Sequence, residues 1–418
     1  MFELKGKYST AKVMIDQVEL ECTSQIISMI NHCAFVNPIA IMPDTHSGKG
    51  SVIGFTMLVG PKVIPNIVGV DIGCGMLSVN LGDIKLDCKE VDSAIRRAVP
   101  FGMEVHDRGV IHMKNDFPWK GSQDYEWFVA KCKQIGIDLS YAINSIGTLG
   151  GGNHFIEFGK AMRTGDTWLT VHTGSRNFGK RVCDYWQKVA AGTDDGAKKA
   201  KLAAGIEEIK RTAKNGAEIG QRISELKKSL NIQKKVTGLE YLESFNAAGY
   251  MEDMYFSQVY AKVNRVYIVH NILAAMGLSE LGIPVTRDRI ETIHNFIDPQ
   301  DHIIRKGAVR SYAGEKMIIP LNPHDGTLIC EGKSNPEWNF SAPHGAGRVM
   351  SRRKAKETIS QEVADNAMEG VYASAKPIDE SPLAYKDSSL IAECIEPTAK
   401  IIDRIIPFMN LKAGDGEE

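Results

Sequence analysis

The chain has 418 residues, of which 43% are hydrophobic and 24% charged, and its formal net charge is -1. This length fits one large domain or two ordinary ones, and the composition is typical of a globular protein with a sizeable core. The near-neutral charge excludes a protein that binds nucleic acid through a global basic field. No stretch approaches the roughly 20 apolar residues of a membrane span, and MFELKGKYST lacks a signal-peptide pattern. We therefore expect a cytoplasmic protein with no membrane partner.

Short apolar runs punctuated by glycine and proline predict strands between Ile39 and about Gly82. These runs are IAIMPD, GSVIGFTMLVG, NIVGVD and MLSVNLG. Helical periodicity then predicts helices at Val91–Val99 and Tyr125–Tyr141. The next two segments each combine a strand with a glycine-rich loop, and they read SIGTLGGGNHFIEFG and TWLTVHTGSRNFG.

The composition shifts after Phe178, where Lys, Glu, Ala and Gln become frequent. This composition predicts a mostly helical section over residues 180–277, inserted into a β-rich body. Within it, we interpret the basic stretch Lys198–Lys235 as a solvated helix face rather than an RNA contact. Short strands resume after Arg287, and two late helices are predicted at Arg352–Asp365 and Ser389–Ile406.

Together these elements predict a mixed α/β (α+β) fold in a single large domain that spans residues 1–418. We expect a β-rich metal-binding core with the helical section 180–277 as an insertion. No internal repeat or low-complexity tract argues for another organisation.

Cysteine usage singles out one residue of eight. The cysteines have no regular spacing, so no disulfide framework is expected, and in a reducing compartment most would be buried small apolar residues. Cys74 differs because it shares the turn VGVDIGCGM with Asp71. A structural turn needs glycines, but it needs no thiol beside a carboxylate.

Metal-ligand side chains recur on glycine-rich turns in MPDTHSGKG, VGVDIGCGM, GTLGGGNHFIE, VHTGSRNFG and SAPHGAGRVMSR, and ETIHNF carries His294. No local spacing matches a zinc finger or an HExxH helix, so tertiary folding must bring the ligands together. Each histidine taken alone is more often a satisfied core or turn residue than a metal ligand, and only the joint pattern favours a metal site. The candidate ligand set is Asp71, Cys74, His154, His172 and His294.

This donor set favours a two-metal centre. Imidazole suits several first-row metals, and a carboxylate adds preference for harder ions such as Mn²⁺. A thiolate can bridge two ions, which would explain a single cysteine. Five protein ligands exceed a closed four-coordinate zinc site and suit two metals with positions open for phosphate oxygens.

Arginines follow two of the turns, Arg176 in HTGSR and Arg348 and Arg352 in HGAGRVMSR. Their planar guanidinium groups match phosphate oxygens, whereas Arg353 fits a solvated helix surface. The loop GTLGGGN lacks the GK[ST] ending of a Walker A motif and is weak evidence for nucleotide binding. These residues point to phosphoryl or nucleotidyl transfer without identifying the substrate.

Seven motifs in order resemble the RtcB family of RNA-splicing ligases, from about Ile39 to Asp387. They are MPDTHSGKG, VGVDIGCGM, GTLGGGNHFIE, HTGSRNFG, HN at 294–295, RKGAV and HGAGRVMSR. The resemblance implies an enzyme that joins RNA 3′-phosphate or 2′,3′-cyclic phosphate ends to 5′-hydroxyl ends, in RNA repair or splicing, with GTP and two Mn²⁺ ions. It also implies that His344 is guanylylated and passes the guanylyl group to RNA, giving an RNA-3′-pp-5′-G intermediate.

The resemblance further implies roles for individual residues. Cys74 is the metal ligand shared by both ions, and Asp44 is a catalytic acidic residue near the metals. RNA phosphates are expected at Arg176, Arg348 and Arg352. An archease-like activator would fit the family, although no residue indicates one. The expected nucleotide contacts are Asn153, His154, Phe155, Ile156, Glu157, His294, Asn295, Pro320, Asn322, Thr327, His344, Gly345, Ala346, Gly347, Tyr385 and Lys412.

One loop departs from the family pattern, because IIPLNPHDGTL stands where a PGSMG-type loop is common. This departure keeps a second hypothesis open, a metal-dependent phosphoesterase that opens cyclic phosphates without ligation and makes no use of His344. A third hypothesis is a non-catalytic RNA-binding paralogue. The presence of every ligand type and of the nucleophile argues against the third.

Overall fold

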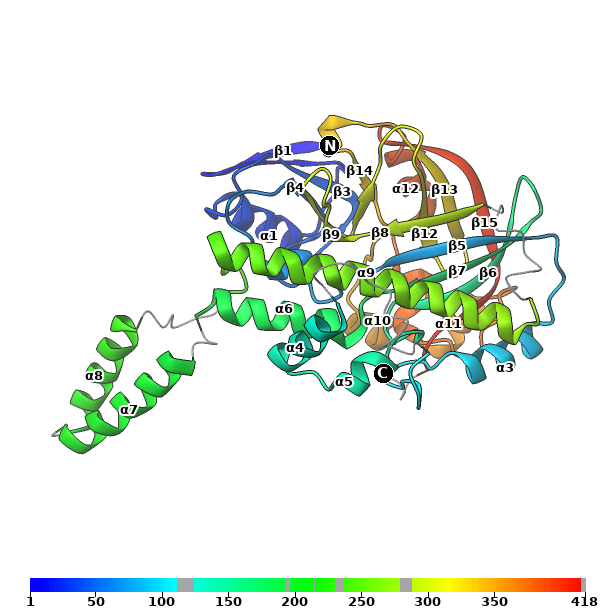
Figure 1. The fold of residues 1–418 in the computed structure, drawn as a ribbon. Coiled ribbons are helices and arrows are strands. Elements are labelled where there is room, and N and C mark those ends of the chain that lie inside the picture. Colours follow the sequence, from blue (N-terminus) through cyan, green and yellow to red (C-terminus); the bar gives the residue numbers. More distant parts are fainter. Residues whose placement is uncertain (111–123, 193–195, 214, 231–236, 279–287, 415–418) are drawn as a thin grey trace.

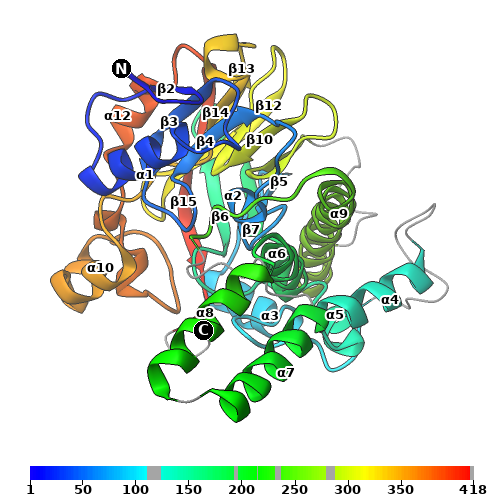
Figure 2. The ribbon, with the colours of Figure 1, turned by 90° about the vertical axis from the view of Figure 1, so that its left-hand side faces the viewer.

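The structure, a computed structural model, describes residues 1–110, 124–192, 196–213, 215–230, 237–278 and 288–414. Two large sheets lie side by side, and a long helix crosses the second of them (Figures 1 and 2). The predicted mixed α/β fold is thereby confirmed. None of the helices in these residues is both long and apolar enough to cross a membrane.

The first sheet has six strands in the order β1-β2-β3-β4-β10-β9. Only β2 and β3 pair in parallel, and the other neighbours are antiparallel. The strand bounds are β1 (Phe2–Lys5), β2 (Thr10–Val13), β3 (Ile39–His46), β4 (Ile53–Leu58), β9 (Asn295–Ile297) and β10 (Ile303–Lys306).

The second sheet has seven strands, all antiparallel, in the order β12-β13-β15-β6-β7-β5-β8. Its edge strands approach each other, because the Ile318 N–H donates to the Thr292 hydroxyl at 3.1 Å. A separate pair joins β11 (Ala308–Arg310) to β14 (Ser341–Pro343). The bounds are β5 (Gly75–Gly82), β6 (Phe155–Ala161), β7 (Thr167–Thr173), β8 (Arg289–Ile293), β12 (Lys316–Asn322), β13 (Gly326–Gly332) and β15 (Ala399–Leu411).

The two sheets are linked directly at His294. Strand β8 ends at Ile293 in the second sheet, and β9 begins at Asn295 in the first. A single residue therefore separates the two sheets at this point of the chain. Any group that His294 binds lies at the junction between them.

Helix α9 (Ser244–Ala275) packs along the second sheet with α3 (Cys88–Ala98) and α6 (Arg176–Ala190) beside it. Its Ile268 and Ile272 join Val171 of β7 in a buried apolar cluster, which fixes the helix to the sheet. The other helices are α1 (Leu20–Ile30), α2 (Pro65–Val68), α4 (Tyr125–Ile135), α5 (Leu139–Asn144), α10 (Arg352–Thr358), α11 (Gln361–Asn366) and α12 (Ser388–Cys394), with 3₁₀ turns η1 (Pro336–Trp338), η2 (Ile378–Glu380) and η3 (Pro382–Ala384).

Helices α7 (Gly196–Thr212) and α8 (Gly216–Ser229) form a hairpin that projects from the body, at the left of Figure 1. The hairpin packs on itself, with Leu226 against Gly205. Within the described part of residues 180–277 the chain is mostly helical, but only this hairpin stands apart from the body. Helices α6 and α9 belong to the core.

Two predicted elements are wrong. The run NIVGVD was expected as a strand, but Pro65 opens the short helix α2, where its fixed φ suits a first helical turn. The predicted helix Ser389–Ile406 is instead α12 followed by β15. Pro397 interrupts the helix, and β-branched residues after it pair in the sheet.

Two other predicted helices are interrupted. The helix expected at Tyr125–Tyr141 ends at Gly136, which has a φ of 69° and closes α4, before α5 begins. The helix expected at Arg352–Asp365 is divided where Ser360 caps α11 by accepting a bond from the Val363 N–H. The helix predicted at Val91–Val99 is confirmed as α3.

Candidate metal and nucleotide site

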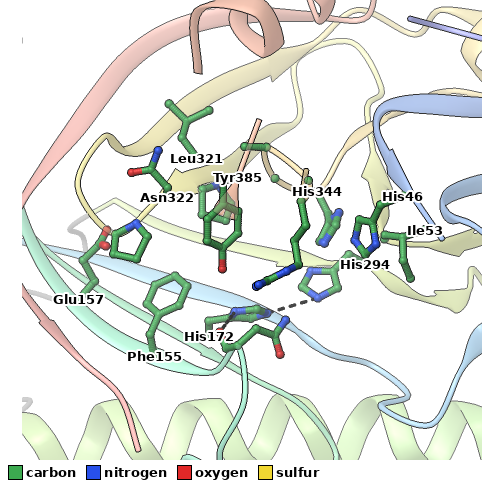
Figure 3. Close-up of a pocket in the computed structure, with 18 of the residues that line it drawn as sticks. His46, Ile53, Phe155, Glu157, His172, His294, Leu321, Asn322, His344 and Tyr385 are labelled. Carbon is green, nitrogen blue, oxygen red and sulfur yellow. Dashed lines mark hydrogen bonds between the residues drawn. The ribbon is translucent and has the colours of Figure 1, made fainter. Parts of the chain in front are cut away.

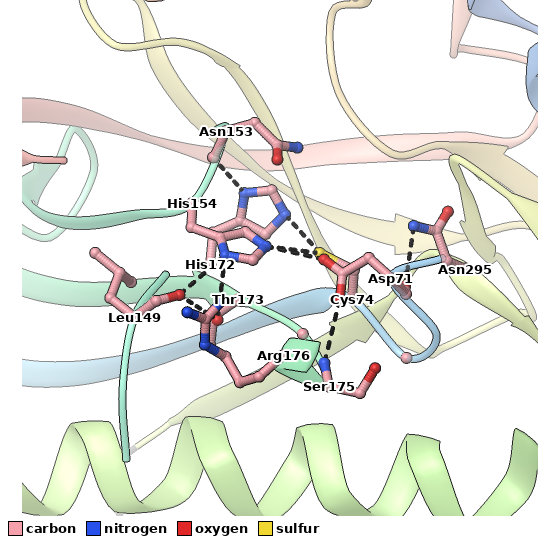
Figure 4. Close-up of polar contacts among 12 residues, drawn as sticks. Asp71, Cys74, Leu149, Asn153, His154, His172, Thr173, Ser175, Arg176 and Asn295 are labelled. Carbon is pink, nitrogen blue, oxygen red and sulfur yellow. Dashed lines mark hydrogen bonds and ion pairs between the residues drawn. The ribbon is translucent and has the colours of Figure 1, made fainter. Parts of the chain in front are cut away.

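The five predicted metal ligands come together from four segments. Figure 4 shows Asp71, Cys74, His154 and His172 facing one another. Asp71 and Cys74 lie on the turn between α2 and β5, which the Cys74 N–H closes by donating to the Asp71 carbonyl at 3.2 Å. Gly73 within this turn has a φ of 71°, a conformation that side chains rarely adopt. His154 precedes β6, and His172 lies near the end of β7.

Cys74 is the centre of the cluster. Its Sγ lies 3.4 Å from the His172 Nε2 and 3.6 Å from the His154 Nε2. One possible ligand group contains Cys74, His172 and His294, and the other contains Asp71, Cys74 and His154. The thiol belongs to both groups, which is the geometry a bridging ligand needs.

Hydrogen bonds orient two of the imidazoles toward the cluster. The Nδ1 of His154 faces the Leu149 carbonyl at 2.9 Å, and the Nδ1 of His172 faces the Asn153 carbonyl at 3.0 Å. A ring nitrogen that faces a carbonyl oxygen carries a proton, so the Nε2 of neutral His172 presents a lone pair. The His154 Nε2 lies 2.9 Å from the Asp71 Oδ2. A proton on the His154 Nε2 makes this contact a hydrogen bond, and a bound cation would take the place of that proton.

The charges of the cluster also suit a cation. Burial lowers the pKa of His172 and of His294 well below the usual value, so both rings are neutral. Burial opposes ionisation of Asp71, but the hydrogen bond and charge of His154 lower its pKa to about 2. Burial and Asp71 raise the pKa of the Cys74 thiol well above normal. A metal would therefore displace the thiol proton on binding.

His344 lies beside the cluster, with its ring centroid 4.8 Å from that of His294. Its Nδ1 is 2.6 Å from the buried Asp44 Oδ2, and its backbone N–H donates to the same oxygen at 3.2 Å. Asp44 thus holds the proton on Nδ1 and leaves the Nε2 lone pair free. Gly347 makes this approach feasible, because a side chain there would overlap the Asp44 backbone.

A cavity of about 300 Å³ opens beside His344 and the metal ligands (Figure 3). Most predicted nucleotide contacts line it: Asn153, Phe155, Glu157, His294, Asn295, Pro320, Asn322, His344, Gly345, Ala346, Gly347, Tyr385 and Lys412. Alternation along β6 explains why Phe155 and Glu157 share this face. The arrangement places the His344 imidazole where the cluster of candidate metal ligands meets the cavity.

Three predicted nucleotide contacts do not line the cavity. His154 lies in the cluster of candidate ligands, and Ile156 points from β6 into the apolar core. Thr327 is buried and donates to the Glu157 Oε1 at 3.3 Å. Thr327 therefore supports a lining residue and does not reach the cavity itself.

Glu157 is an unusual carboxyl group in this pocket. Burial raises its pKa to about 7, although hydrogen bonds from Asn410 and Thr327 oppose the shift. The Asn410 amide donates to the Glu157 Oε2 at 2.9 Å. The hydrogen bond thereby holds the carboxyl group in one orientation. Near neutral pH the protonated and ionised forms of Glu157 are similarly populated.

The predicted phosphate-binding arginines have protein partners. Arg348 and Arg352 line the cavity, but both pair with Glu380, at 3.2 and 2.7 Å. Arg176 lies outside the cavity, where it donates to the Thr148 hydroxyl at 3.1 Å and the Gly102 carbonyl at 2.8 Å. We therefore find Arg176 supporting the glycine loop rather than facing the pocket.

Glu380 forms hydrogen bonds or ion pairs with several polar groups of the pocket. Its Oε2 lies 2.8 Å from the Lys412 Nζ and accepts the Tyr385 hydroxyl at 2.7 Å. Burial opposes its ionisation, but the charges of Lys412, Arg352 and Arg348 lower its pKa to about 2. The carboxylate thus fixes two predicted nucleotide contacts in place.

Sequence analysis missed several lining residues, including His46, Gly307 and Asn410. His46 lies within the motif MPDTHSGKG, so the signal was present. Its Nδ1 faces the Ser47 carbonyl at 3.0 Å, and burial lowers its pKa to about 4. Asn410 had no signal, because only the pairing of β15 with β6 brings it opposite Glu157.

Comparison with known proteins identifies the family to which the chain belongs. The family model described as tRNA-splicing ligase RtcB matches residues 25–413. The chain belongs to the RtcB family. It is similar to RNA-splicing ligase RtcB of Escherichia coli K12, at 29% identity over 92% of each chain, and to RNA-splicing ligase RtcB1 of another E. coli strain (ATCC 25922), at 30% identity over 92% of each chain. A tRNA-splicing ligase RtcB of Pyrobaculum aerophilum is 24% identical over 84% of this chain and 82% of its own.

Proposed function

We propose that this protein is an RNA ligase that uses GTP and Mn²⁺ to join an RNA 3′-phosphate or 2′,3′-cyclic phosphate end to a 5′-hydroxyl end. Membership of the RtcB family supports an RNA ligase. The observation that carries the finer proposal is His344, whose free Nε2 lies between the ligand cluster and the cavity. A phosphoesterase has no need of such a nucleophile.

The cluster of Asp71, Cys74, His154, His172 and His294 is proposed to hold two Mn²⁺ ions. Its mixture of nitrogen, oxygen and sulfur donors fits a first-row metal, and the shared Cys74 fits two ions. When bound, the ions neutralise phosphate charge and favour in-line displacement. His172 and His294, which burial keeps neutral, and ionised Asp71 are already in the protonation states that metal binding requires.

The chain's own part in the first step falls to His344 and Asp44. The His344 Nε2 attacks the α-phosphorus of GTP, an N–P bond forms, and the bond to pyrophosphate breaks. Asp44 accepts the Nδ1 proton in a hydrogen bond and stabilises the positive charge that develops on the ring. The product is guanylylated His344 plus pyrophosphate.

Two transfers complete the reaction. An oxygen of the RNA 3′-phosphate attacks the guanylyl phosphorus, the N–P bond breaks, and free His344 returns. The 5′-hydroxyl of the second RNA end then attacks the activated 3′-phosphate, loses its proton, and releases GMP. A 2′,3′-cyclic phosphate first takes up water to become a 3′-phosphate.

Glu157 and Lys412 are proposed to face the guanine base in the cavity. A carboxylate can accept two N–H groups from one edge of guanine, while Lys412 can donate to a base oxygen or nitrogen. Both side chains are held by protein contacts, Glu157 by Asn410 and Lys412 by Glu380. Fixed groups of this kind favour selectivity for one base.

Ligation with defined ends tests the proposal. Labelled RNA carrying a 3′-phosphate or a 2′,3′-cyclic phosphate is incubated with a 5′-hydroxyl RNA, Mn²⁺ and GTP, using wild type and His344→Ala. We expect a joined product only with wild type and only with GTP. Arg353→Ala is the matched control, because its side chain is exposed and lies outside the cavity.

The same assay separates the phosphoesterase hypothesis. If wild type and His344→Ala both open the cyclic phosphate and neither joins the RNAs, the protein is a phosphoesterase. If wild type neither opens the cyclic phosphate nor joins RNA with Mn²⁺ present, the result supports the hypothesis of a non-catalytic RNA-binding paralogue.

A further inference from the structure

Helix α9 places two consecutive polar residues, Asn264 and Arg265, at the base of the metal cluster. Both side chains are fully buried, at 0% exposure. An amide and a guanidinium in the interior are costly unless their hydrogen bonds are made. The partners of these two residues therefore indicate why they are there.

Asn264 joins two loops. Its Oδ1 accepts the backbone N–H groups of Gly147 and Thr148, at 2.8 and 3.1 Å. Its Nδ2 donates to the carbonyls of Thr148 and Gly174, at 3.2 and 3.1 Å. One side chain thus ties the loop that leads to His154 to the end of the strand that carries His172.

Arg265 joins three segments. Its Nη1 donates to the carbonyls of Gly73 and Thr173, at 2.8 and 3.0 Å. Its Nη2 lies 3.1 Å from the Glu291 Oε1 on β8. The guanidinium therefore holds the turn of Asp71 and Cys74, the end of β7, and the strand that leads to His294.

Every segment that carries a proposed ligand is bonded to this one helical turn. Gly73 lies between Asp71 and Cys74, and Thr173 follows His172 directly. Figure 4 shows a helix in the yellow-green of α9 passing beneath these segments. The hydrogen bonds of Asn264 and Arg265 reach backbone atoms, the Thr173 hydroxyl and Glu291 rather than ligand atoms, so both residues set the ligand positions through neighbouring groups. Burial raises the pKa of the Cys74 thiol, the positive charge of Arg265 opposes this rise, and Arg265→Lys retains that charge.

We propose that Asn264 and Arg265 are positioning residues that set the affinity and geometry of the two-metal centre. They fix the separations of four segments that no local sequence holds together. The inference rests on the proposed metal site and adds residues outside the ligand set. The alternative is that the pair only fastens α9 to the sheet, in which case it affects stability alone.

Conservative changes separate these roles. Arg265→Lys keeps the charge, but one ammonium lacks the planar fork that reaches Gly73, Thr173 and Glu291 together. Asn264→Asp keeps the oxygen that accepts from Gly147 and Thr148. Its second oxygen replaces the amide donor and therefore repels the carbonyls of Thr148 and Gly174. Mutation of residues that support metal ligands typically lowers metal affinity about 10–100-fold. We expect a loss of that size for each variant.

Metal binding is measured directly, without RNA or GTP. Metal-free protein is titrated with Mn²⁺, with free ion followed by electron paramagnetic resonance, and then with Co²⁺, whose absorption reports thiolate coordination. Arg265→Lys and Asn264→Asp should bind Mn²⁺ about 10–100-fold more weakly. Their Co²⁺ spectra should differ from wild type in band position, a change that lower stability alone would not produce.

Arg305→Lys is the matched control. Arg305 is also fully buried on a strand, and it pairs with Asp298 and Asp301, two carboxylates that follow β9 and make no hydrogen bond to Asn264 or Arg265. We expect it to lower thermal stability and leave Mn²⁺ affinity and the Co²⁺ spectrum unchanged. Glu291→Gln, which loosens one anchor of Arg265, serves if Arg265→Lys does not fold.

Three outcomes distinguish the hypotheses. Weaker metal binding and an altered spectrum in the α9 variants, with a normal control, support positioning. Wild-type affinity and spectrum in folded Asn264→Asp and in Arg265→Lys or Glu291→Gln overturn it, as does an equal change in Arg305→Lys. If wild-type protein binds neither ion, the proposed metal centre itself fails, and the inference fails with it.

Discussion

Asp44 Oδ2 receives both the His344 backbone N–H and the Nδ1 proton, so one carboxylate oxygen sets the position and the tautomer of the proposed nucleophile. Its other oxygen, Oδ1, is buried without a hydrogen-bond partner among the described residues. Within the described part of the chain, His344 therefore supplies both of the hydrogen bonds that the Asp44 carboxylate accepts. At the scale of single residues, this pair and the raised pKa of Glu157 give the sharpest expectations.

The first expectation concerns the tautomer. Asn in place of Asp44 can donate to Nδ1, which moves the ring proton to Nε2 and removes the attacking lone pair. Asp44→Asn should slow transfer of label from GTP to the protein by about 10²–10⁴-fold, with the fold retained. Initial rates of labelling measure this, and a rate within about twofold of wild type would refute the assigned role.

The second expectation concerns pH. Glu157 has a pKa of about 7 in the folded protein, above its ordinary value, so it is mainly protonated below that pH. If the carboxylate accepts from guanine, it must lose this proton first, and GTP affinity should fall about tenfold per pH unit below 7. Binding titrations between about pH 6 and pH 8 test this. Glu157→Gln should bind weakly with no such slope, and a flat wild-type profile would contradict the assignment.

At the scale of elements, the glycine-rich turns were predictable because ligand residues and glycines are adjacent in sequence. The helix α2 and the strand β15 were not, since Pro65 fits either a strand end or a first helical turn, and β15 depends on its partners β6 and β13. Asn264 and Arg265 gave no signal either. Their hydrogen-bond partners lie more than 20 residues away in the chain, and the periodicity of a helix does not predict such distant partners.

The α7–α8 hairpin gives an expectation at this scale. Because it packs on itself and projects from the body, replacing residues 196–230 with a short Gly/Ser linker should leave the melting temperature of the body nearly unchanged. Labelling by GTP should also persist, because none of the described hairpin residues lines the cavity. Calorimetry and labelling check both points. A large loss of stability would show that the hairpin belongs to the core.

Across the whole molecule, the ligand cluster joins the two sheets. Asp71, Cys74, His154 and His172 belong to segments flanking or within the second sheet, while His294 links it to the first. The sequence predicted which residues would meet, but not that they meet at this junction, because sheet pairing is set by contacts far apart in the chain. A metal bound there should stabilise the fold as a unit.

Mn²⁺ should therefore raise the melting temperature by several degrees, since a ligand that binds only the folded state stabilises it. Cys74→Ala removes the shared ligand and should abolish the shift and the bound Mn²⁺. Cys330→Ala is the control, because Cys330 is buried in an apolar cluster with Val309 and Met317 that contains none of the proposed ligands. Stoichiometric Mn²⁺ retained by Cys74→Ala would contradict the bridging role.

The most direct test of the account is covalent labelling of His344. Protein is incubated with Mn²⁺ and GTP labelled at the α-phosphate, then denatured and examined for protein-bound label that is lost in acid, as a phosphoramidate would be. The account predicts one acid-labile guanylyl group on wild type and none on His344→Ala. Absence of label on metal-loaded wild type, or equal label on His344→Ala, would contradict it.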